Sequence, residues 1–294
     1  MKRYFLASGS SAVVVGLFVL SSTVTYAATS PDLGMAASFG ILSSTYTNTA
    51  SGTTINGDLG YTTGPKVAPT ANGATYSPPS TKYSTAGTDQ GSALANLNSQ
   101  PCTFTFAAGA VDLATDTSHG SLGTYTPGVY CTAESSAASI GAAGITLSGS
   151  GTFIFRVNGA LTTVSNSAVR ARGASACNVF WTPTAATTLG ANSAFVGTDI
   201  DGSGITIGST VTWTGQALAF GGTVSTSTDT ISVATCTAAT PTPTPRPIPS
   251  VPPSGASGTT PGGFPTIPTG LALLLGGSLV VTTVWMRRRR AIGA

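Results

Sequence analysis

Charged residues are scarce in this sequence. Only 7% of its 294 residues are Asp, Glu, Lys or Arg, against roughly 25% in an ordinary soluble protein. Half of the twelve basic residues lie at the two ends of the chain, so the nine acidic residues give the remainder a net charge of −3. Because no basic surface is available to hold phosphates, we expect no nucleic-acid partner.

Groups that carry catalysis or hold metals are equally few. His119 is the single histidine, and the nine carboxylates are scattered without a catalytic motif. Polysaccharide-degrading β-helices need clustered carboxylates with a basic residue or Ca²⁺. The segment 199–204 resembles the start of a calcium loop but lacks the later bidentate glutamate, so we interpret it as a polar corner. We therefore expect no enzymatic activity, no metal site and no cofactor.

The N-terminus has the pattern of a secretory signal peptide. Lys2 and Arg3 precede an apolar stretch at residues 12–20, and small residues end the segment. The apolar stretch is too short to cross a bilayer, which needs about 20 residues. We expect residues 1–27 to form a signal peptide that is cleaved after Ala27.

The C-terminus has the pattern of a membrane anchor. Residues 267–286 are uncharged and are followed by four arginines, so they predict a transmembrane helix with a basic cytoplasmic tail at 287–294. Residues 237–266 are rich in Pro, Thr and Gly, which favours an extended stalk. The sequence thus predicts a single-pass protein of the cell membrane with an extracellular domain at 29–236. A sortase-processed, wall-linked form stays as an alternative, although residues 265–270 lack the proper Leu-Pro-x-Thr-Gly order.

The four cysteines predict two disulfides. Cys102, Cys131, Cys177 and Cys236 all lie in the exported segment, without the spacing of a zinc site. Four cysteines allow three pairings. We favour Cys102 with Cys131 and Cys177 with Cys236, because the second pair would tie the last strand into the domain just before the stalk.

The middle of the chain predicts short strands and one helix. Apolar residues alternate with polar ones in segments such as 145–147, 153–157, 205–207 and 211–213, and glycine soon turns the chain after each of them. Repeated short strands favour an irregular β-solenoid over a sandwich. In contrast, apolar residues at spacings of three and four predict a helix over about 82–99.

A series of landmarks resembles the ice-binding-protein-like family catalogued as domain of unknown function 3494. In chain order the landmarks are residues 32–42, 47–49, 55–60, 125–130, 153–157, 178–181, 188–190, 195–197 and 215–219. The resemblance implies an all-β fold with one helix, a discontinuous right-handed β-solenoid of triangular section with a long helix packed alongside. It also implies ice as the partner, because members studied for function bind ice and act as antifreeze proteins.

Threonines on the strands are the candidate ice-binding residues. A threonine has a stiff side chain, so on a strand it holds its hydroxyl and methyl groups in fixed positions. Alternation places Thr146, Thr188, Thr206, Thr212 and Thr214 outside, next to apolar residues that point inward. We expect these five residues to lie on one face, although threonine is also simply a good strand former.

A short motif adds two further candidates. Strong members of the family carry Thr-Ala/Gly-x-Thr/Asn on the ice-binding face, and Thr184 and Thr187 match it within a predicted coil. Two other matches begin at Thr85 and Thr237, and the abundance of threonine makes such matches expected by chance. An alternative function remains, in which the domain is a surface adhesin or structural module that binds a glycan or another cell.

Overall fold

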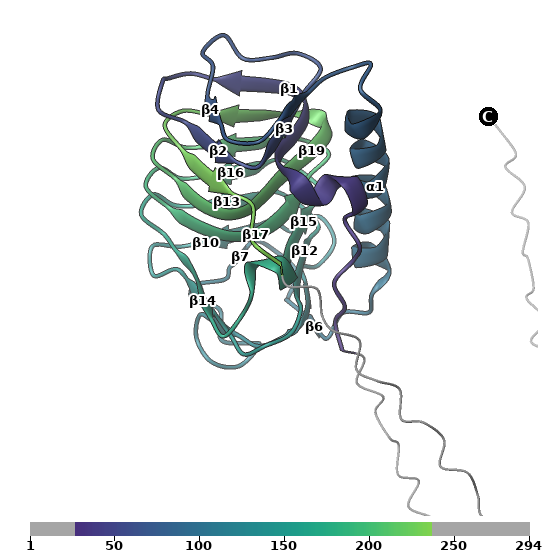
Figure 1. The fold of residues 1–294 in the computed structure, drawn as a ribbon. Helices are drawn as coiled ribbons and strands as arrows, with labels where there is room; N and C mark the ends of the chain where they lie inside the picture. The colour runs from purple at the N-terminus through teal and green to yellow at the C-terminus, as the bar shows by residue number, and fades with distance from the viewer. Residues whose placement is uncertain (1–26, 237–294) are drawn as a thin grey trace, which may run out of the picture. The chain divides into compact units, whose positions relative to one another are not determined.

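The computed structural model of the protein describes residues 27–236, where parallel strands stack on three sides of one core. Figure 1 shows these coils with a single long helix, α1, along one side. The signal peptide is predicted on residues of which only Ala27 is described, and the stalk, transmembrane helix and tail are predicted on residues outside the described ones. Between residues 27 and 236, no helix has the length and apolar character needed to span a bilayer.

We name the three sides of the solenoid the helix face, the ladder face and the arginine face. The helix face contains β3 (Asp58–Gly60), β5 (Thr75–Tyr76), β6 (Phe104–Thr105), β9 (Gly128–Cys131), β12 (Phe153–Val157), β15 (Val179–Pro183), and parts of β1 (Phe39–Asn48), β17 (Ala194–Ile200) and β19 (Thr212–Thr226). The ladder face contains β7 (Val111–Asp112), β10 (Ala138–Ile140), β13 (Leu161–Thr163), β16 (Thr187–Leu189), β18 (Ile205–Ile207), and the ends of β1 and β19. The arginine face contains β2 (Thr54–Asn56), β4 (Thr70–Ala71), β8 (Thr124–Tyr125), β11 (Ile145–Ser148), β14 (Val169–Arg172), β20 (Thr230–Ser232), and the starts of β17 and β19.

The order of the coils in space differs from their order in sequence. The first strand β1 pairs in parallel with the last long strand β19, for example Ile41 with Ala217. Two short 3₁₀ helices, η1 (Gly34–Ser38) and η2 (Ala176–Asn178), lie outside the strands. The solenoid prediction is confirmed, and the N-terminal coil covers the C-terminal one rather than beginning the stack.

The core of the solenoid is a column of aromatic rings. Neighbouring rings of Tyr130, Phe155, Trp181, Phe195 and Trp213 have centroids 5.4, 4.2, 5.1 and 5.0 Å apart. All five residues are buried. Each ring comes from a successive coil, so the column joins the coils through contacts of the kind that stabilise aromatic pairs.

The helix covers the helix face. The structure places α1 at Thr81–Ser99, as the apolar spacing predicts. Its first turn is capped by Ser80, whose Oγ accepts a hydrogen bond from the Tyr83 amide. Buried residues of α1, including Ala86 and Leu97, pack on outward side chains of the sheet such as Phe180. Both surfaces of these strands are therefore buried, one by the core and one by α1.

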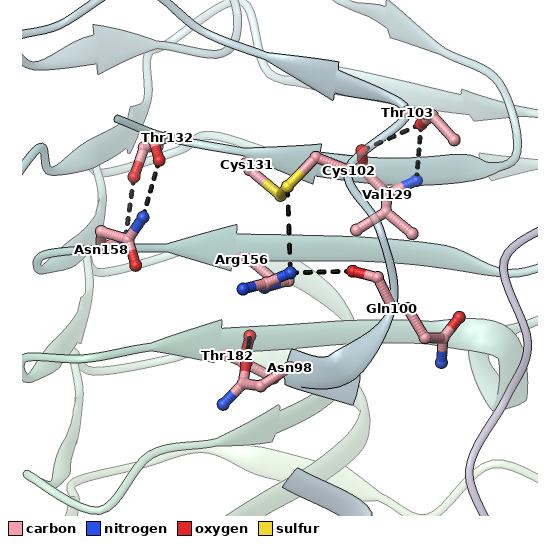
Figure 2. Close-up of a disulfide and its surroundings, with 10 residues drawn as sticks. All are labelled: Asn98, Gln100, Cys102, Thr103, Val129, Cys131, Thr132, Arg156, Asn158 and Thr182. Atoms are coloured by element: carbon pink, nitrogen blue, oxygen red, sulfur yellow. Dashed lines mark hydrogen bonds between the residues drawn. A yellow bond between two sulfur atoms is a disulfide. The ribbon is translucent and has the colours of Figure 1, made fainter. Parts of the chain in front are cut away.

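A disulfide and an arginine hold the C-terminal end of α1 on the sheet (Figure 2). Cys102 is bonded to Cys131 of β9. Arg156 of β12 donates from Nη1 to the Gln100 carbonyl oxygen at 2.9 Å, and the same nitrogen lies 3.8 Å from Cys102 Sγ. A cation at this end also interacts favourably with the helix dipole. The second predicted disulfide, Cys177–Cys236, is present too, and none of the cysteines is free in the described part of the chain.

Two stacked glycines make the turn between the arginine face and the helix face. Gly197 and Gly215 have φ of 110° and 149°, in backbone conformations that side chains disfavour. A Cβ atom at position 215 would lie 1.9 Å from the Gly197 carbonyl oxygen. Trp213 Nε1 donates to that same oxygen at 2.8 Å, so a shift at this turn would disturb the aromatic column.

We predict that Gly215→Ala lowers the free energy of unfolding by at least ~2 kcal/mol, through backbone strain and steric clash. Gly91→Ala is the matched control, because Gly91 is an exposed helical residue with open space around its Cα. It should stabilise the protein by about 0.5–1 kcal/mol. Denaturant unfolding of both variants measures the difference, and equal effects would contradict the proposed strain at position 215.

Candidate functional site

A ladder of short polar side chains runs along the ladder face. Parallel register places one outward residue of each strand beside the equivalent residue of the next strand. From one end to the other, the ladder is Asp112, Ser139, Thr162, Thr188, Thr206, Ser225 and Thr47. Because neighbouring strands lie about 4.8 Å apart, the hydroxyl groups repeat at a nearly constant distance.

The central three rungs are available to solvent. Thr162, Thr188 and Thr206 are exposed, and their hydroxyl groups form no hydrogen bond with any other described residue. At one end, the Thr47 hydroxyl donates to Ser225 Oγ at 2.7 Å. The centre of the ladder therefore keeps its hydroxyl groups free for an external partner.

Small, uncharged residues lie beside the central rungs of the ladder. Small residues flank the central rungs two positions before and after them, namely Ala160, Ala186 and Gly204 on one side and Val164, Gly190 and Gly208 on the other. Val164 is 45% exposed, which places apolar methyl groups on this surface. Charged residues lie at the two ends of the ladder. Asp112 is at one end, and Lys66 is near Thr47 at the other.

Backbone amides bind the carboxylate at the acidic end of the ladder. Asp112 Oδ1 accepts hydrogen bonds from the Ala114 and Gly141 amides at 3.0 and 2.9 Å. At the other end, a groove of about 460 Å³ separates Thr47 from the loop that carries Lys66. The ladder face thus has six hydroxyl rungs, with Asp112 at one end and the groove beside Thr47 at the other.

The predicted outward directions are confirmed, but the prediction of a single face is wrong. Thr188 and Thr206 pair directly on the ladder face. Thr146, Thr212 and Thr214 lie instead on the arginine face. Alternation along a strand distinguishes inside from outside, whereas it carries no information about which of three sides a strand occupies.

Thr187 cannot contact an external surface. Its side chain is fully buried and points into the core, on the opposite side of β16 from Thr188. Its amide donates to Asp201 Oδ2 at 2.8 Å. Thr184 is exposed, but it lies in the turn before β16 rather than on the ladder. The exposed residues of this motif are therefore Thr184 and Ala186, followed by Thr188.

The arginine face has its own polar array. At one end of this face, two columns of Thr, Ser and Asn side chains run across four strands. One column is Thr212, Thr230, Thr54 and Thr70, and the other is Thr214, Ser232, Asn56 and Asn72. The other end carries Arg170 beside Thr146, and Arg172 beside Ser148. Charge therefore interrupts this face, in contrast to the ladder face.

Sequence reasoning missed four of the six hydroxyl rungs. Ser139 and Thr162 follow apolar residues, and Ser225 and Thr47 do so too. The alternation is obscured because some of the next inward residues are also polar. Thr163 donates to Ser193 Oγ at 3.5 Å, and Thr226 Oγ1 lies 2.8 Å from the Tyr46 hydroxyl oxygen. A search for Thr or Ser directly after an apolar residue in each short strand could have found these rungs.

The segment that resembles a calcium loop forms a corner between the helix face and the ladder face. Asp201 Oδ1 accepts from the Ser203 and Gly204 amides at 2.6 and 3.3 Å, and its Oδ2 accepts from Thr187. Within residues 27–236 there is no group of three or more His, Cys, Asp or Glu side chains that could hold a metal. The carboxylate of Asp201 thus joins two turns of backbone.

Asp199 lies in the core on β17, where it pairs in register with Trp181 and Ala217. It is fully buried, and neither of its carboxyl oxygens has a hydrogen-bond partner. The Thr187 hydroxyl is buried and unpaired as well. Burial, with a smaller contribution from the nearby Asp201, raises the pKa of Asp199 well above its ordinary value. The folded protein therefore favours a protonated Asp199.

We predict that this carboxyl group makes the protein less stable as the pH rises. The unfolded chain releases the Asp199 proton at its ordinary pKa, whereas the folded chain releases it only at a higher pH, so rising pH between these two pKa values favours unfolding. Asp199→Asn, which mimics the neutral acid, should gain stability over the wild type with increasing pH. Thermal unfolding between about pH 5 and 9 measures this, because unperturbed carboxylates are already ionised there.

Other acidic residues also contribute to the pH dependence of stability. Burial also raises the pKa of Asp201 and of Asp229, so Asp199→Asn should reduce the slope without removing it. The pKa of Asp58 and of Asp116 is lowered instead, and their stabilisation is lost only on acidification below this range. Identical slopes for wild type and Asp199→Asn would contradict a protonated core carboxyl.

Known ice-binding proteins resemble this chain in sequence and in fold. A sequence profile of the family described as Ice-binding-like matches residues 41–232. The crystal structure of an ice-binding protein from the Antarctic ascomycete Antarctomyces psychrotrophicus is 26% identical, with a TM-score of 0.61 over 71% of this chain and 100% of that one. An ice-binding protein from an Antarctic biological consortium is 26% identical, with a TM-score of 0.63 over 72% and 94%. The DUF3494 domain of Shewanella frigidimarina ice-binding protein 1 is 25% identical, with a TM-score of 0.60 over 72% and 100%.

These matches define the class of the protein. The chain is a β-solenoid with one packed helix, like the ice-binding proteins whose structures it resembles. It belongs to the Ice-binding-like family. The family and these relatives are described by binding to ice and not by a catalysed reaction. Curated protein sequences gave no match.

Proposed function

We propose that the protein adsorbs to ice through the ladder face. The observation that supports this most is the ladder itself, six hydroxyl rungs with an uncharged centre. Charged groups would orient water around themselves, whereas regularly spaced hydroxyl and methyl groups can hold water in an ordered layer. Thr162, Thr188 and Thr206 present both groups in fixed positions, because a threonine side chain on a strand has few rotamers.

The core makes this surface rigid. Leu161, Leu189, Ile205 and Ile207 point inward from the same strands and are at most 3% exposed. Close packing of these side chains prevents the strands from shifting individually. The ladder is therefore organised before it meets a partner, which lowers the entropy that binding would cost.

The proposal includes a tether to the cell membrane. The sequence features behind it are the signal peptide at 1–27, the stalk at 237–266, the anchor at 267–286 and the basic tail at 287–294. A tethered domain gains avidity, because many copies on one cell can contact the same crystal. Under this proposal the protein is an extracellular, membrane-anchored ice binder.

We predict that Thr206→Tyr strongly reduces inhibition of ice recrystallisation. The large ring would stand above the central rungs and keep neighbouring hydroxyl groups away from a flat crystal. Thr212→Tyr is the matched control, because Thr212 is likewise an exposed strand threonine and lies on the arginine face. Thr206→Val should have a smaller effect than Thr206→Tyr, since it keeps the surface flat.

Several outcomes would decide against this proposal. If Thr212→Tyr abolishes activity and Thr206→Tyr does not, the arginine face is the binding face. If the wild-type protein does not differ from buffer, the proposed ice function is wrong. Thermal unfolding of both tyrosine variants verifies that the fold is retained.

The tether has a separate test. In a secreting host, the full chain should fractionate with membranes and resist extraction by alkaline carbonate. A chain that ends at Cys236 should appear in the medium, because it lacks the predicted stalk and anchor. Release of the full chain by carbonate alone would contradict a membrane-spanning anchor.

A further inference from the structure

A second cavity lies far from the ladder centre, where the arginine face meets the helix face. It has a volume of about 610 Å³ and is bounded by the β6 region, by the ends of β8 and β11, and by the N-terminal segment. This size is within the range of small-molecule sites in proteins. None of its lining residues is Asp, Glu, Lys or Arg.

One wall of the cavity is aromatic. Phe104 is half-buried, and its ring packs at 5.0 Å on Phe106 and at 6.1 Å on His119. Tyr130 lies beside it, with its hydroxyl group bonded to the backbone of Thr126. These contacts fix the Phe104 ring, so it presents a preformed apolar surface.

The lining of the cavity also offers free polar groups. The side-chain hydroxyl groups of Thr126 and Ser150 line the cavity and have no hydrogen-bond partner within residues 27–236. An apolar ring and free hydroxyl groups in one cavity suit a ligand with both apolar and hydroxylated surfaces, which is the character of a sugar ring.

A cation lies near this cavity, on the strand β14 that pairs with β11. Register pairing places Arg172 beside Ser148, two residues before Ser150 of the lining. Arg172 is exposed, and no described acidic residue forms an ion pair with it. Arg170 lies on the same strand, but its Nη1 donates to the Ala143 carbonyl oxygen at 3.1 Å. Arg172 is therefore the group that can meet an anionic ligand.

We propose that this cavity and Arg172 bind an acidic polysaccharide built of uronic acids. A sugar ring would pack on Phe104 and accept hydrogen bonds from Thr126 and Ser150, while its carboxylate would pair with the Arg172 guanidinium. If the signal peptide is cleaved after Ala27, the new ammonium group of Ala28 adds a positive charge to the lining of the same cavity. The site is separate from the ladder face, so one molecule could contact ice and a surface polymer together.

The test is native electrophoresis of the full chain, in detergent, through gels that contain alginate, a polyuronate. Wild type should be retarded by alginate and not by uncharged dextran, and added salt should weaken the retardation. Arg172→Gln should raise the apparent dissociation constant about tenfold or more, as expected for a lost charged hydrogen bond. Phe104→Leu should also weaken binding while thermal unfolding shows an intact fold.

Lys66→Gln provides the matched control, because it removes the same charge from the opposite end of the solenoid. It should bind alginate like the wild type. Equal weakening by Lys66→Gln would overturn the proposal in favour of general charge attraction, and equal retardation by dextran would indicate a neutral sugar. Equally tight binding to dextran sulfate would show that charge alone is recognised, and no retardation in any gel would refute the site. Arg172→Gln should keep the wild-type effect on ice recrystallisation.

Discussion

Parallel, in-register pairing of short strands is the constraint on which the whole domain depends. Each coil places its residues directly above the equivalent residues of the next coil, at a spacing of about 4.8 Å. Inside, this register stacks Phe155 on Trp181 and Phe195 on Trp213, and the rings of Trp181 and Phe195, 5.1 Å apart, join the two pairs into one column. Outside, the same register aligns hydroxyl groups into the ladder. The core and the candidate binding surface are thus two consequences of one backbone arrangement.

Much of this arrangement could be predicted from local pattern. The alternation in residues 205–207 and 211–213 gave correct inward and outward directions, and the three-and-four spacing located α1 to within one residue of Thr81–Ser99. Both disulfide pairings are correct, although the cysteine spacing alone left three open. Strands and helices depend on interactions within one element, which leave a periodic signal in the sequence. The disulfides required a choice among only three pairings.

The division of threonines among the faces could not be predicted in the same way. Thr206 and Thr212 are six residues apart and both exposed, yet a corner between them places them on different sides of the solenoid. The corner depends on long-range contacts, such as the Val211 amide with Asp229 Oδ1 at 2.9 Å. Thr187 shows the opposite difficulty, because its side chain is buried although its hydroxyl group has no partner, and only its backbone amide is bound, by Asp201 of the next coil. The contact that orders this position joins two coils, so the local sequence pattern does not reveal it.

Polar groups in the core determine both where the corners between the faces lie and which polar residues are buried. The corner at Asp201 uses one carboxylate to bind three backbone amides, and so it fixes where β16 and β18 begin. Those strands carry Thr188 and Thr206, the centre of the ladder. The unpaired Asp199 lies in the same interior region, where an ionised carboxylate would be costly. The position of the strands that carry the ladder therefore depends on how the acids beneath them are accommodated, by backbone amides at Asp201 and by a raised pKa at Asp199.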